Sequence, residues 1–364
     1  MCIVSVALNA HPDFPLVLTH NRDEFFDRPS TTPSFKDDVL APRDLIGGGT
    51  WVGYNKVTGT VAALTNVRCR PRSTATFPER SRGNLVARVL AGETEAVACA
   101  AYSRYNLIHG KLSLDAPPEL QLSVCAPPSW KPVSHPLTTT GVERNLGRHR
   151  PRTHVVAKSN DHGGQMTSAT STMDDPCTWA KVKWLRGEVE RVVSGDALRL
   201  CSGESGARVL IDALDPIISA RRMSEDCATC AAAALPSTFS DVAVCDERWM
   251  QAGPFVVPFH REASPPSNGL YGTVSQTVLI QCRSEGCLFF AHREILSARS
   301  TEGANAKTSP RSDDDGDRGT VPSQASVWSW TRVPLPSLNG KCSKRKRDHA
   351  SSSQDHSTVN RQVA

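Results

Sequence analysis

Two apolar segments near the N-terminus, joined by a breaker-rich stretch, constrain the fold more than any other feature of the sequence. Cys2–Leu8 (CIVSVAL) and Leu16–Glu24 (LVLTHNRDE) are rich in residues that favour strands, and the NAHPDFP between them is rich in turn residues. The pattern predicts an antiparallel hairpin. Paired residues of such a hairpin keep a constant index sum, so a turn centred near Pro12 places Cys2 roughly opposite Arg22.

A second hairpin is predicted after the glycine run Gly47–Gly49. The chain there reads TWVGYN, turns at Lys56–Gly59 and returns as TVAALTN, which ends on the polar residue Asn66. The glycine run is not followed by the Lys-Ser/Thr pair of a phosphate-binding loop, so we expect it to permit close backbone packing near a site. Strands that end on polar residues at one edge of a sheet are a common way to build such a site.

Further along, the sequence predicts two helices and more strands. Apolar residues at helical spacing predict a helix within Arg82–Tyr105, broken at Gly92, and another across Trp179–Val193. The Pro-rich stretch His109–Lys158 predicts strands joined by long loops. The last strong strand pair is QTVLIQC and CLFFAHRE, joined by a turn around Ser284–Gly286.

The sequence changes character after about Ser300. Apolar periodicity disappears there, and the segment is rich in serine and in charged residues. We therefore predict one folded domain over residues 1–299 and a disordered basic tail over residues 300–364.

Charge and composition restrict the functional class. The formal net charge is +5, and residues 300–364 supply +3 of it through ten Lys/Arg against seven Asp/Glu, so the body of the chain is nearly neutral. A nucleic-acid-binding surface needs a concentrated basic face, so nucleic acid is not the predicted partner. The twelve cysteines have no regular spacing, and no apolar stretch reaches the roughly 18 residues of a membrane span. With no signal-peptide pattern at the N-terminus, these features predict a cytoplasmic protein with reduced thiols and no transmembrane segment.

Cys2 is the first candidate for a catalytic residue. An initiator methionine before a small residue is normally excised, which leaves a thiol and an α-amine on the same residue. The amine, with a reference pKa of about 8, can accept the thiol proton near neutrality. A neighbouring guanidinium would stabilise the thiolate. The alternative is a cysteine at the second position with no role.

The run Asn21-Arg22-Asp23-Glu24 gives Cys2 predicted neighbours. Four polar residues at the end of an apolar strand often form only a solvated turn. Beside Cys2 they gain roles: Arg22 is expected to hold the thiolate or a substrate carboxylate, and Asp23 to orient the α-amine.

Two asparagines at strand ends are candidate oxyanion donors. The side-chain amide of Asn66 can aim N–H groups at a developing negative charge, and Asn160 ends the similar segment HVVAKSN. The alternative for each is a turn-capping role.

The remaining motifs are weaker. Cys227 and Cys230 form a CxxC without a second pair of ligands, and the eleven histidines lack metal-ligand spacing, so no metal site is predicted. The basic segment around Lys344–Arg347 resembles a nuclear-import signal or a patch for anionic surfaces, with a solubilising run as the alternative.

These residues resemble the NRDE family, also called the Transport and Golgi organization family, which is named for the tetrapeptide at Asn21–Glu24. The shared blocks, in family order over residues 1–295, are MCI, NRDEFFDRPS, GGGTWVGYN, ALTNVR, SRGNLV, YNL, SN at Ser159 and YGTVSQTVL. The resemblance implies an α+β fold, a four-layer αββα sandwich of the N-terminal nucleophile (Ntn) hydrolase type. Relatives in that superfamily include cysteine amidases of the bile-salt hydrolase and penicillin acylase type.

The resemblance also implies roles for individual residues. Cys2 matches the nucleophile of the superfamily, Arg22 and Asp23 its arginine and aspartate, and Asn66 and Asn160 its two site asparagines. One departure is Val274, where the family usually has arginine, so a basic side chain is missing.

Two functions of different classes stay open. One is a cysteine amidohydrolase that acts on an amide C–N bond of an unidentified small molecule, such as an acyl amide, and needs no cofactor. The other is a non-catalytic binding or trafficking protein for haem or lipid. The family resemblance implies a link to Golgi organization and protein secretion, with association with Golgi or mitochondria, and a nuclear regulatory protein is a third reading.

Overall fold

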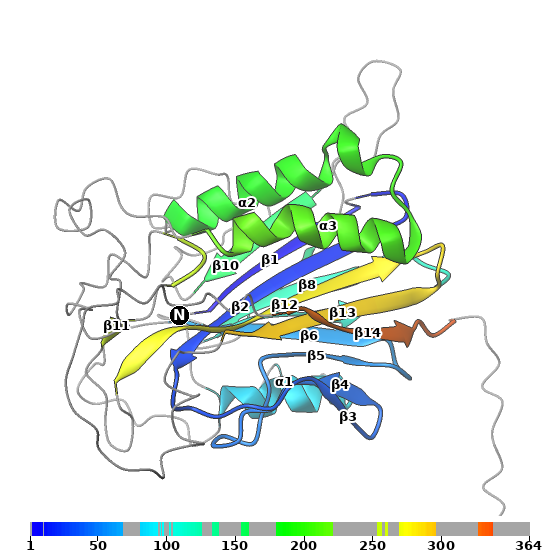
Figure 1. The fold of residues 1–364 in the computed structure, drawn as a ribbon. Coiled ribbons are helices and arrows are strands. Elements are labelled where there is room, and N and C mark those ends of the chain that lie inside the picture. Colours follow the sequence, from blue (N-terminus) through cyan, green and yellow to red (C-terminus); the bar gives the residue numbers. More distant parts are fainter. Residues whose placement is uncertain are drawn as a thin grey trace, which may run out of the picture.

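The computed structural model describes residues 2–9, 11–67, 81–93, 95, 97, 102, 105–125, 133–137, 154–159, 180–220, 253–256, 259–260, 269–295 and 327–337. This part of the chain forms a mixed α+β fold, as predicted, with two antiparallel sheets and helices on their outer faces (Figure 1).

The first sheet is built around the predicted N-terminal hairpin. Its order is β10 (His154–Ser159), β1 (Ile3–Leu8), β2 (Leu16–Phe25), β12 (Leu270–Cys282), β13 (Cys287–Glu294) and β14 (Ser329–Pro334), with β11 (Phe259–His260) also paired to β12. Ile3 pairs with Asn21 and Leu8 with Leu16, so the predicted index sum holds, and one step beyond Ile3 the same register sets Cys2 opposite Arg22. The β12–β13 hairpin is also confirmed.

The second sheet follows chain order. Its strands are β3 (Ser34–Lys36), β4 (Val39–Ala41), β5 (Val52–Asn55), β6 (Thr60–Asn66), β7 (Tyr105–Lys111), β8 (Glu119–Cys125) and β9 (Val133–Leu137). The predicted second hairpin is therefore β5–β6, and Gly59 in its turn has a φ of 69°, a conformation that glycine adopts without strain.

In the described part of the chain, three helices cover the outer faces of the sheets. They are α1 (Arg82–Leu90), α2 (Ala180–Val193) and α3 (Gly203–Ile218), with a short 3₁₀ turn η2 (Asp196–Leu198) before α3. Helix α2 confirms the second predicted helix, and α1 ends two residues before Gly92, whose φ of 96° stops the helix. Helix α3 was not predicted.

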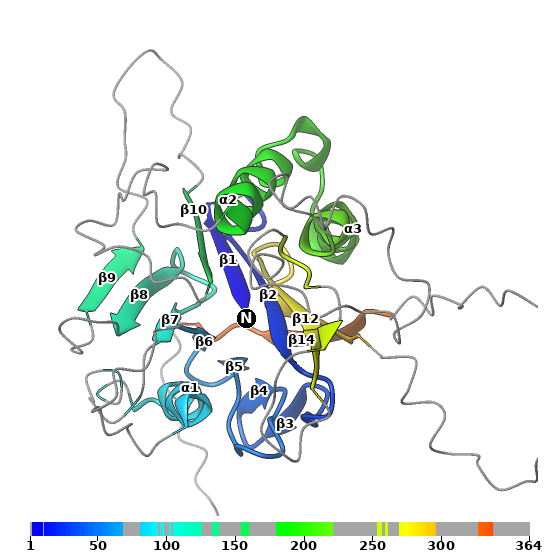
Figure 2. The ribbon, with the colours of Figure 1, turned by 90° about the vertical axis from the view of Figure 1, so that its left-hand side faces the viewer.

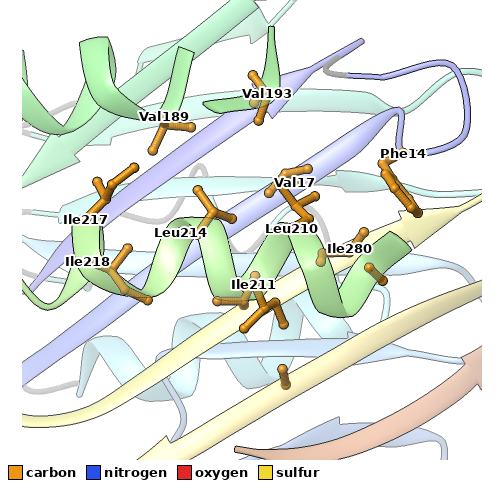
Figure 3. Packing of buried hydrophobic residues seen from close by; sticks show 14 of the residues in the cluster. Phe14, Val17, Val189, Val193, Leu210, Ile211, Leu214, Ile217, Ile218 and Ile280 are labelled. Carbon is orange, nitrogen blue, oxygen red and sulfur yellow. The ribbon is translucent and has the colours of Figure 1, made fainter. Parts of the chain in front are cut away.

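Figure 2 shows the layers from a second side, turned by 90° from Figure 1. Apolar clusters fill the spaces between the layers. Helices α2 and α3 pack on one face of the first sheet, where Leu210 and Leu214 meet Val17 (Figure 3). The other face of that sheet packs on the second sheet, and α1 covers the far side of the second sheet. Successive side chains of a strand point to opposite faces of its sheet. Both faces of the first sheet are covered, so all residues of β1 are buried.

The predicted disordered tail needs a correction at residues 327–337. Strand β14 in this segment pairs along β13, and the ring of Trp330 packs edge-on against Phe289 at 6.0 Å between centroids. The guanidinium of Arg208 lies 4.6 Å from the Trp330 ring centroid. The large apolar side chains that hold this strand have partners far away in the sequence, so the local composition conceals them. Residues 300–326 and 338–364 lie outside the described residues.

Candidate functional site

Strand β2 divides the Asn-Arg-Asp-Glu run between two faces of the first sheet. Asn21 points toward the helices, where its Nδ2 donates to the main-chain oxygens of Ile218 (2.8 Å) and Pro254 (2.9 Å). Asp23 shares that face by strand alternation, whereas Arg22 and Glu24 line a cavity on the other side. Strand β2 therefore contributes side chains both to the contact with the helix layer and to the wall of the cavity.

The cavity has a volume of about 200 Å³ and gathers residues from both sheets and from the start of α1. It brings together three residues predicted from the sequence, Cys2, Arg22 and Asn66. Of the other two predicted residues, Asp23 lies on the opposite face of β2, and Asn160 is outside the described residues.

Cys2 is nearly enclosed, with 8% of its surface exposed. Burial raises the pKa of its thiol, and the carboxylate of Asp23 raises it further. The α-amino group of the chain and the backbone N–H of Asp23 oppose this by lowering the pKa, but the net shift is upward. The thiol is thus protonated at neutral pH, and nucleophilic attack requires a base.

Arg22 is a fixed cation with only 4% of its surface exposed. Its guanidinium donates to Ser30 Oγ and to Asp44 Oδ2, both at 3.2 Å, and lies 4.2 Å from the ring centroid of Trp51. Arg22 and Cys2 line the same cavity, and the expected role of Arg22 at the thiolate stays a prediction. Its carboxylate partner, however, is Asp44.

Asp44 is a site residue that the sequence reasoning missed. Its Oδ2 also accepts from Arg28 Nε at 2.7 Å, and its Oδ1 accepts the backbone N–H groups of Ile46 and Gly47. Burial alone would raise the pKa of Asp44, but the Gly47 N–H and Arg28 outweigh it, so the pKa lies below its ordinary value. A carboxylate placed three residues before a glycine run was the available signal.

The glycine run packs directly against the first turn of α1, as predicted for it. A Cβ atom on Gly49 would lie 2.3 Å from the carbonyl carbon of Gly83, and the Thr50 N–H donates to Gly83 O at 3.3 Å. This approach places Arg82, a second missed residue, at the cavity wall. Burial lowers the pKa of Arg82, while Cys2 and Glu24 act to raise it.

Asp23 is held in place by side chains from two other elements, β12 and α2. Thr273 Oγ1 donates to Asp23 Oδ1 at 2.7 Å, and Tyr271 Oη donates to the Asp23 main-chain oxygen at 2.9 Å. Lys181 Nζ of α2 lies 3.9 Å from Asp23 Oδ2. The predicted role of Asp23, to orient an α-amine at Cys2, requires a fixed carboxylate, and these contacts fix it.

Comparison with known proteins gives the family. Residues 1–296 match the family described as Transport and Golgi organisation 2. The chain belongs to this family. It is 32% identical to the Transport and Golgi organization protein 2 homolog of Bos taurus over 133 residues, which cover 32% of this chain and 47% of the relative. The Homo sapiens homolog is 31% identical over 131 residues, 31% of this chain and 46% of the relative.

The alignments differ in extent. An uncharacterized Saccharomyces cerevisiae protein is 25% identical over 330 residues, which is 85% of this chain and 97% of that protein. The chain spans about half the length of the mammalian relatives it matches.

Within this Transport and Golgi organisation 2 chain, Val274 occupies a special position on β12. The pairing of β12 with β2 shifts register between Thr273 and Ser275, so Val274 is the extra residue of a bulge. Its main-chain oxygen accepts from the Ile295 N–H at 2.8 Å. Val274, the position at which the sequence was expected to depart from the family, therefore lies in a bulge of β12, next to Thr273, which donates a hydrogen bond to Asp23.

No metal or haem site emerges among the residues that the structure describes. They contain no group of three or more His, Cys, Asp or Glu arranged for a metal ion, and Cys227 and Cys230 lie outside them. The described walls enclose about 200 Å³, which is below the roughly 300–1,000 Å³ of typical small-molecule pockets. No helix in the described part of the chain is long and apolar enough to cross a membrane.

Proposed function

We propose that this protein is a cysteine amidohydrolase of the Ntn type, which cleaves an amide C–N bond of a small molecule. The single observation that carries the proposal is that Cys2 lines one cavity with Arg22 and Asn66. The order of helix layer, two facing sheets and helix layer supports the four-layer Ntn arrangement as part of the same proposal.

The proposed reaction begins with removal of Met1, which leaves an α-amine on Cys2. The amine takes the thiol proton, and the thiolate attacks the amide carbonyl. The Asn66 amide donates to the oxyanion, while Asp23 orients the ammonium. The ammonium then protonates the leaving amine as the C–N bond breaks, and water hydrolyses the Cys2 thioester to release the acid and regenerate the thiol.

This proposal can be tested by trapping the acyl-enzyme on the N-terminal peptide. Purified protein is incubated with a set of acyl amides, quenched in acid and digested, and the N-terminal peptide is weighed by mass spectrometry. We expect an acyl mass on Cys2, absent in Cys2→Ala, with Met1 removed in both proteins. Cys201→Ala is the matched control, because Cys201 is a partly exposed thiol outside the cavity and should leave the signal unchanged.

Two results would contradict the hydrolase. One is retention of Met1, which leaves no amine at Cys2 to act as the base. The other is amide turnover that is unchanged in a folded Cys2→Ala protein.

A second candidate function is non-catalytic binding or trafficking of a lipid or haem in Golgi organization and secretion. The observation that favours it is the upward pKa shift of the Cys2 thiol, which makes it a poor nucleophile unless a base is present. A Cys2→Ala gene that restores secretion in knockout cells as well as the wild type does would select binding. Loss of rescue with Cys2→Ala would select the hydrolase.

The proposed location is cytoplasmic, with Golgi association from the family name. Nuclear import through Lys344–Arg347 is tested by deleting residues 341–364 from a fluorescent fusion. We expect a nuclear signal that falls on deletion if the segment acts in import, and an unchanged distribution removes that role.

A further inference from the structure

Two cysteines face each other directly at the end of the β12–β13 hairpin. Cys282 is the last residue of β12, Cys287 is the first residue of β13, and the two are paired in the antiparallel register. Directly opposite residues of such strands point to the same face, and both side chains belong to the apolar cluster shared with α2 and α3. Both thiols are free. The adjacent residue Gln281 pairs with Leu16, at the end of β2 remote from Arg22, so this thiol pair is separate from the cavity.

The backbone geometry of this pair suits a disulfide. Paired residues of antiparallel strands have Cα atoms about 4.5 or 5.5 Å apart, and disulfides span about 4.4–6.8 Å. Their Cβ atoms are about 4.5–5.5 Å apart, whereas a disulfide needs about 3.5–4.5 Å, so the two side chains must approach each other by about 1 Å. The pair adjoins a turn, and the ladder between β12 and β2 ends at Gln281, so the strand ends next to the turn can make this adjustment.

The surroundings of Cys282 tolerate the loss of its thiol proton. Its Sγ donates to Asp13 Oδ2 at 3.5 Å and lies 3.4 Å from Ser284 Oγ. The Asp13 carboxylate also accepts from the N–H and the hydroxyl of Ser284, at 2.6 and 2.7 Å, and from the Gly203 N–H at 2.8 Å. A thiol is a weak donor beside these three groups, so a disulfide at Cys282 leaves the carboxylate satisfied.

The same surroundings make both thiols slow to react. Cys282 and Cys287 are buried, and burial raises the pKa of both thiols, that of Cys287 to about 11. Because the thiolate is the nucleophile, protonated thiols react slowly near neutrality. The turn that joins the two strands is exposed at Arg283 and Ser284, and opening of a strand end is the local motion that admits a reagent. A small reagent fits this route.

We propose that Cys282 and Cys287 form a reversible disulfide with a hydroperoxide, of which hydrogen peroxide is the smallest, as the oxidant. One thiol gives its proton to solvent and its sulfur attacks a peroxide oxygen, so the O–O bond breaks and a sulfenic acid and a hydroxide ion form. The second sulfur attacks the sulfenic sulfur, the S–O bond breaks, and the S–S bond forms. The hydroxide ions combine with the protons of the thiols to give water, so the sulfurs are oxidised and the peroxide is reduced.

The proposed bond is local and reducible. A disulfide whose side chains have to be drawn together is strained, and strained disulfides are readily reduced by thiols. The bond closes the turn that Asp13 joins to the β1–β2 turn and to the start of α3, so it fixes the end of the first sheet remote from the cavity. Its formation requires nothing of Cys2, and the proposal is therefore independent of the proposed hydrolase.

Trypsin digestion tests the bond directly, because Arg283 lies between the two cysteines. Cleavage after Arg261, Arg283 and Arg293 places Cys282 and Cys287 in separate peptides, and only a disulfide keeps these peptides joined. Folded full-length protein is treated with hydrogen peroxide and quenched in acid, its free thiols are blocked with N-ethylmaleimide in denaturant, and it is digested. We expect the joined pair, lighter than the sum of its peptides by two hydrogens, and its complete loss after treatment with dithiothreitol.

Two other cysteines calibrate the reaction. Cys201 is partly exposed, so the peroxide concentration is raised until Cys201 is oxidised. Cys125 is as deeply buried as the pair but faces Tyr105 on β7, so it should be recovered as a blocked thiol. In Cys287→Ala the joined pair should disappear, and Cys282 should be recovered as a blocked thiol or a sulfenic acid. Thermal melting shows whether this variant is folded, and the wild-type result alone decides the proposal where it is not.

Three results would overturn the proposal. One is a pair of separate peptides in wild-type protein whose Cys201 is fully oxidised. Another is a bond from Cys282 to Cys201 instead of Cys287. The third is a joined pair that forms only in urea, where the strand register is lost. Amide cleavage is measured separately on the reduced protein, so failure of the disulfide leaves the proposed hydrolase standing, and failure of the hydrolase leaves the disulfide standing.

Discussion

The contact between the glycine run and α1 allows the sharpest test of how the cavity is assembled. In Gly49→Ala, the added Cβ would lie 2.3 Å from Gly83 C, 2.6 Å from Gly83 Cα and 2.8 Å from Asn84 N. All three atoms are backbone, so no side chain can swing away, and the loop and helix must separate by about 1 Å to reach ordinary contact. Overpacking of this kind costs about 1–3 kcal/mol, and the 3.3 Å bond from Thr50 N to Gly83 O is weakened as well.

Urea denaturation measures this cost, and two other glycines supply the comparison. Gly83→Ala meets the same contact from the other side at 3.1 Å, so it should cost less than Gly49→Ala. Gly187 in α2 has nothing within 4 Å of a built Cβ, so Gly187→Ala should raise the free energy of unfolding by about 0.5–1 kcal/mol. The reasoning is refuted if Gly49→Ala is as stable as the wild type, or if Gly187→Ala loses as much stability as Gly49→Ala does.

Three other predictions concern charge, pH and the edge of the first sheet. Asp44→Asn removes the ionised partner of Arg22 and Arg28 and should cost about 1.5–3 kcal/mol in urea denaturation, whereas Asp38→Asn, which breaks an exposed pair with Lys56, should cost at most about 1 kcal/mol. Because burial lowers the pKa of His20 and His292 from 6.5 to about 4, the unfolded chain binds more protons between these values. Stability should therefore fall as pH drops from 6.5 to 4, by up to about 3 kcal/mol for each histidine. In His292→Gln the slope of unfolding free energy against pH over this range should be shallower than that of the wild type, with His20 and His109, whose pKa burial also lowers, supplying the remainder, and an unchanged slope would exclude His292 as a contributor. Truncation after residue 326 removes β14 and exposes the β13 edge, so it should lower the melting temperature and cause aggregation on size-exclusion chromatography, while truncation after residue 337 keeps β14 and should leave both unchanged.

Local pattern was enough to predict the parts of the fold that short turns determine. The register of a hairpin follows from the position of its turn, so the sequence alone predicts that Cys2 and Arg22 lie opposite each other. The same holds for β5–β6 and β12–β13, whose strands are joined by turns of four residues. In each case the interacting residues are close in sequence, and alternation fixes which face they share.

Elements that are stabilised by residues far away in the sequence could not be predicted from local sequence pattern. Helix α3 contains Gly203, Gly206 and Pro216, which locally discourage a helix. The apolar face of α3 gains its partners only by packing on the first sheet. A Cβ on Gly206 would lie 2.9 Å from Cys201 C and 3.0 Å from the Phe14 ring, so this glycine is required by close approach in the folded chain. Strand β14 is similar, because the ring of Trp330 on this strand packs against Phe289 and lies under Arg208, both far away in the sequence.

The candidate site also combines residues that local pattern predicts with residues that come from distant parts of the chain. The predicted residues Cys2, Arg22 and Asp23 lie within one hairpin, whereas Asp44, Arg82 and Lys181 come from a loop and two helices. Asp44 pairs with Arg22 and Arg28 on the cavity side, and Lys181 lies 3.9 Å from Asp23 on the helix side, so charges of the hairpin have counter-charges on both faces of the sheet. Arg22, already bound to Asp44, is thus less able to draw a proton from the Cys2 thiol than the sequence suggested. In the proposed hydrolase reaction, the α-amine of Cys2 is therefore the group that activates the thiol.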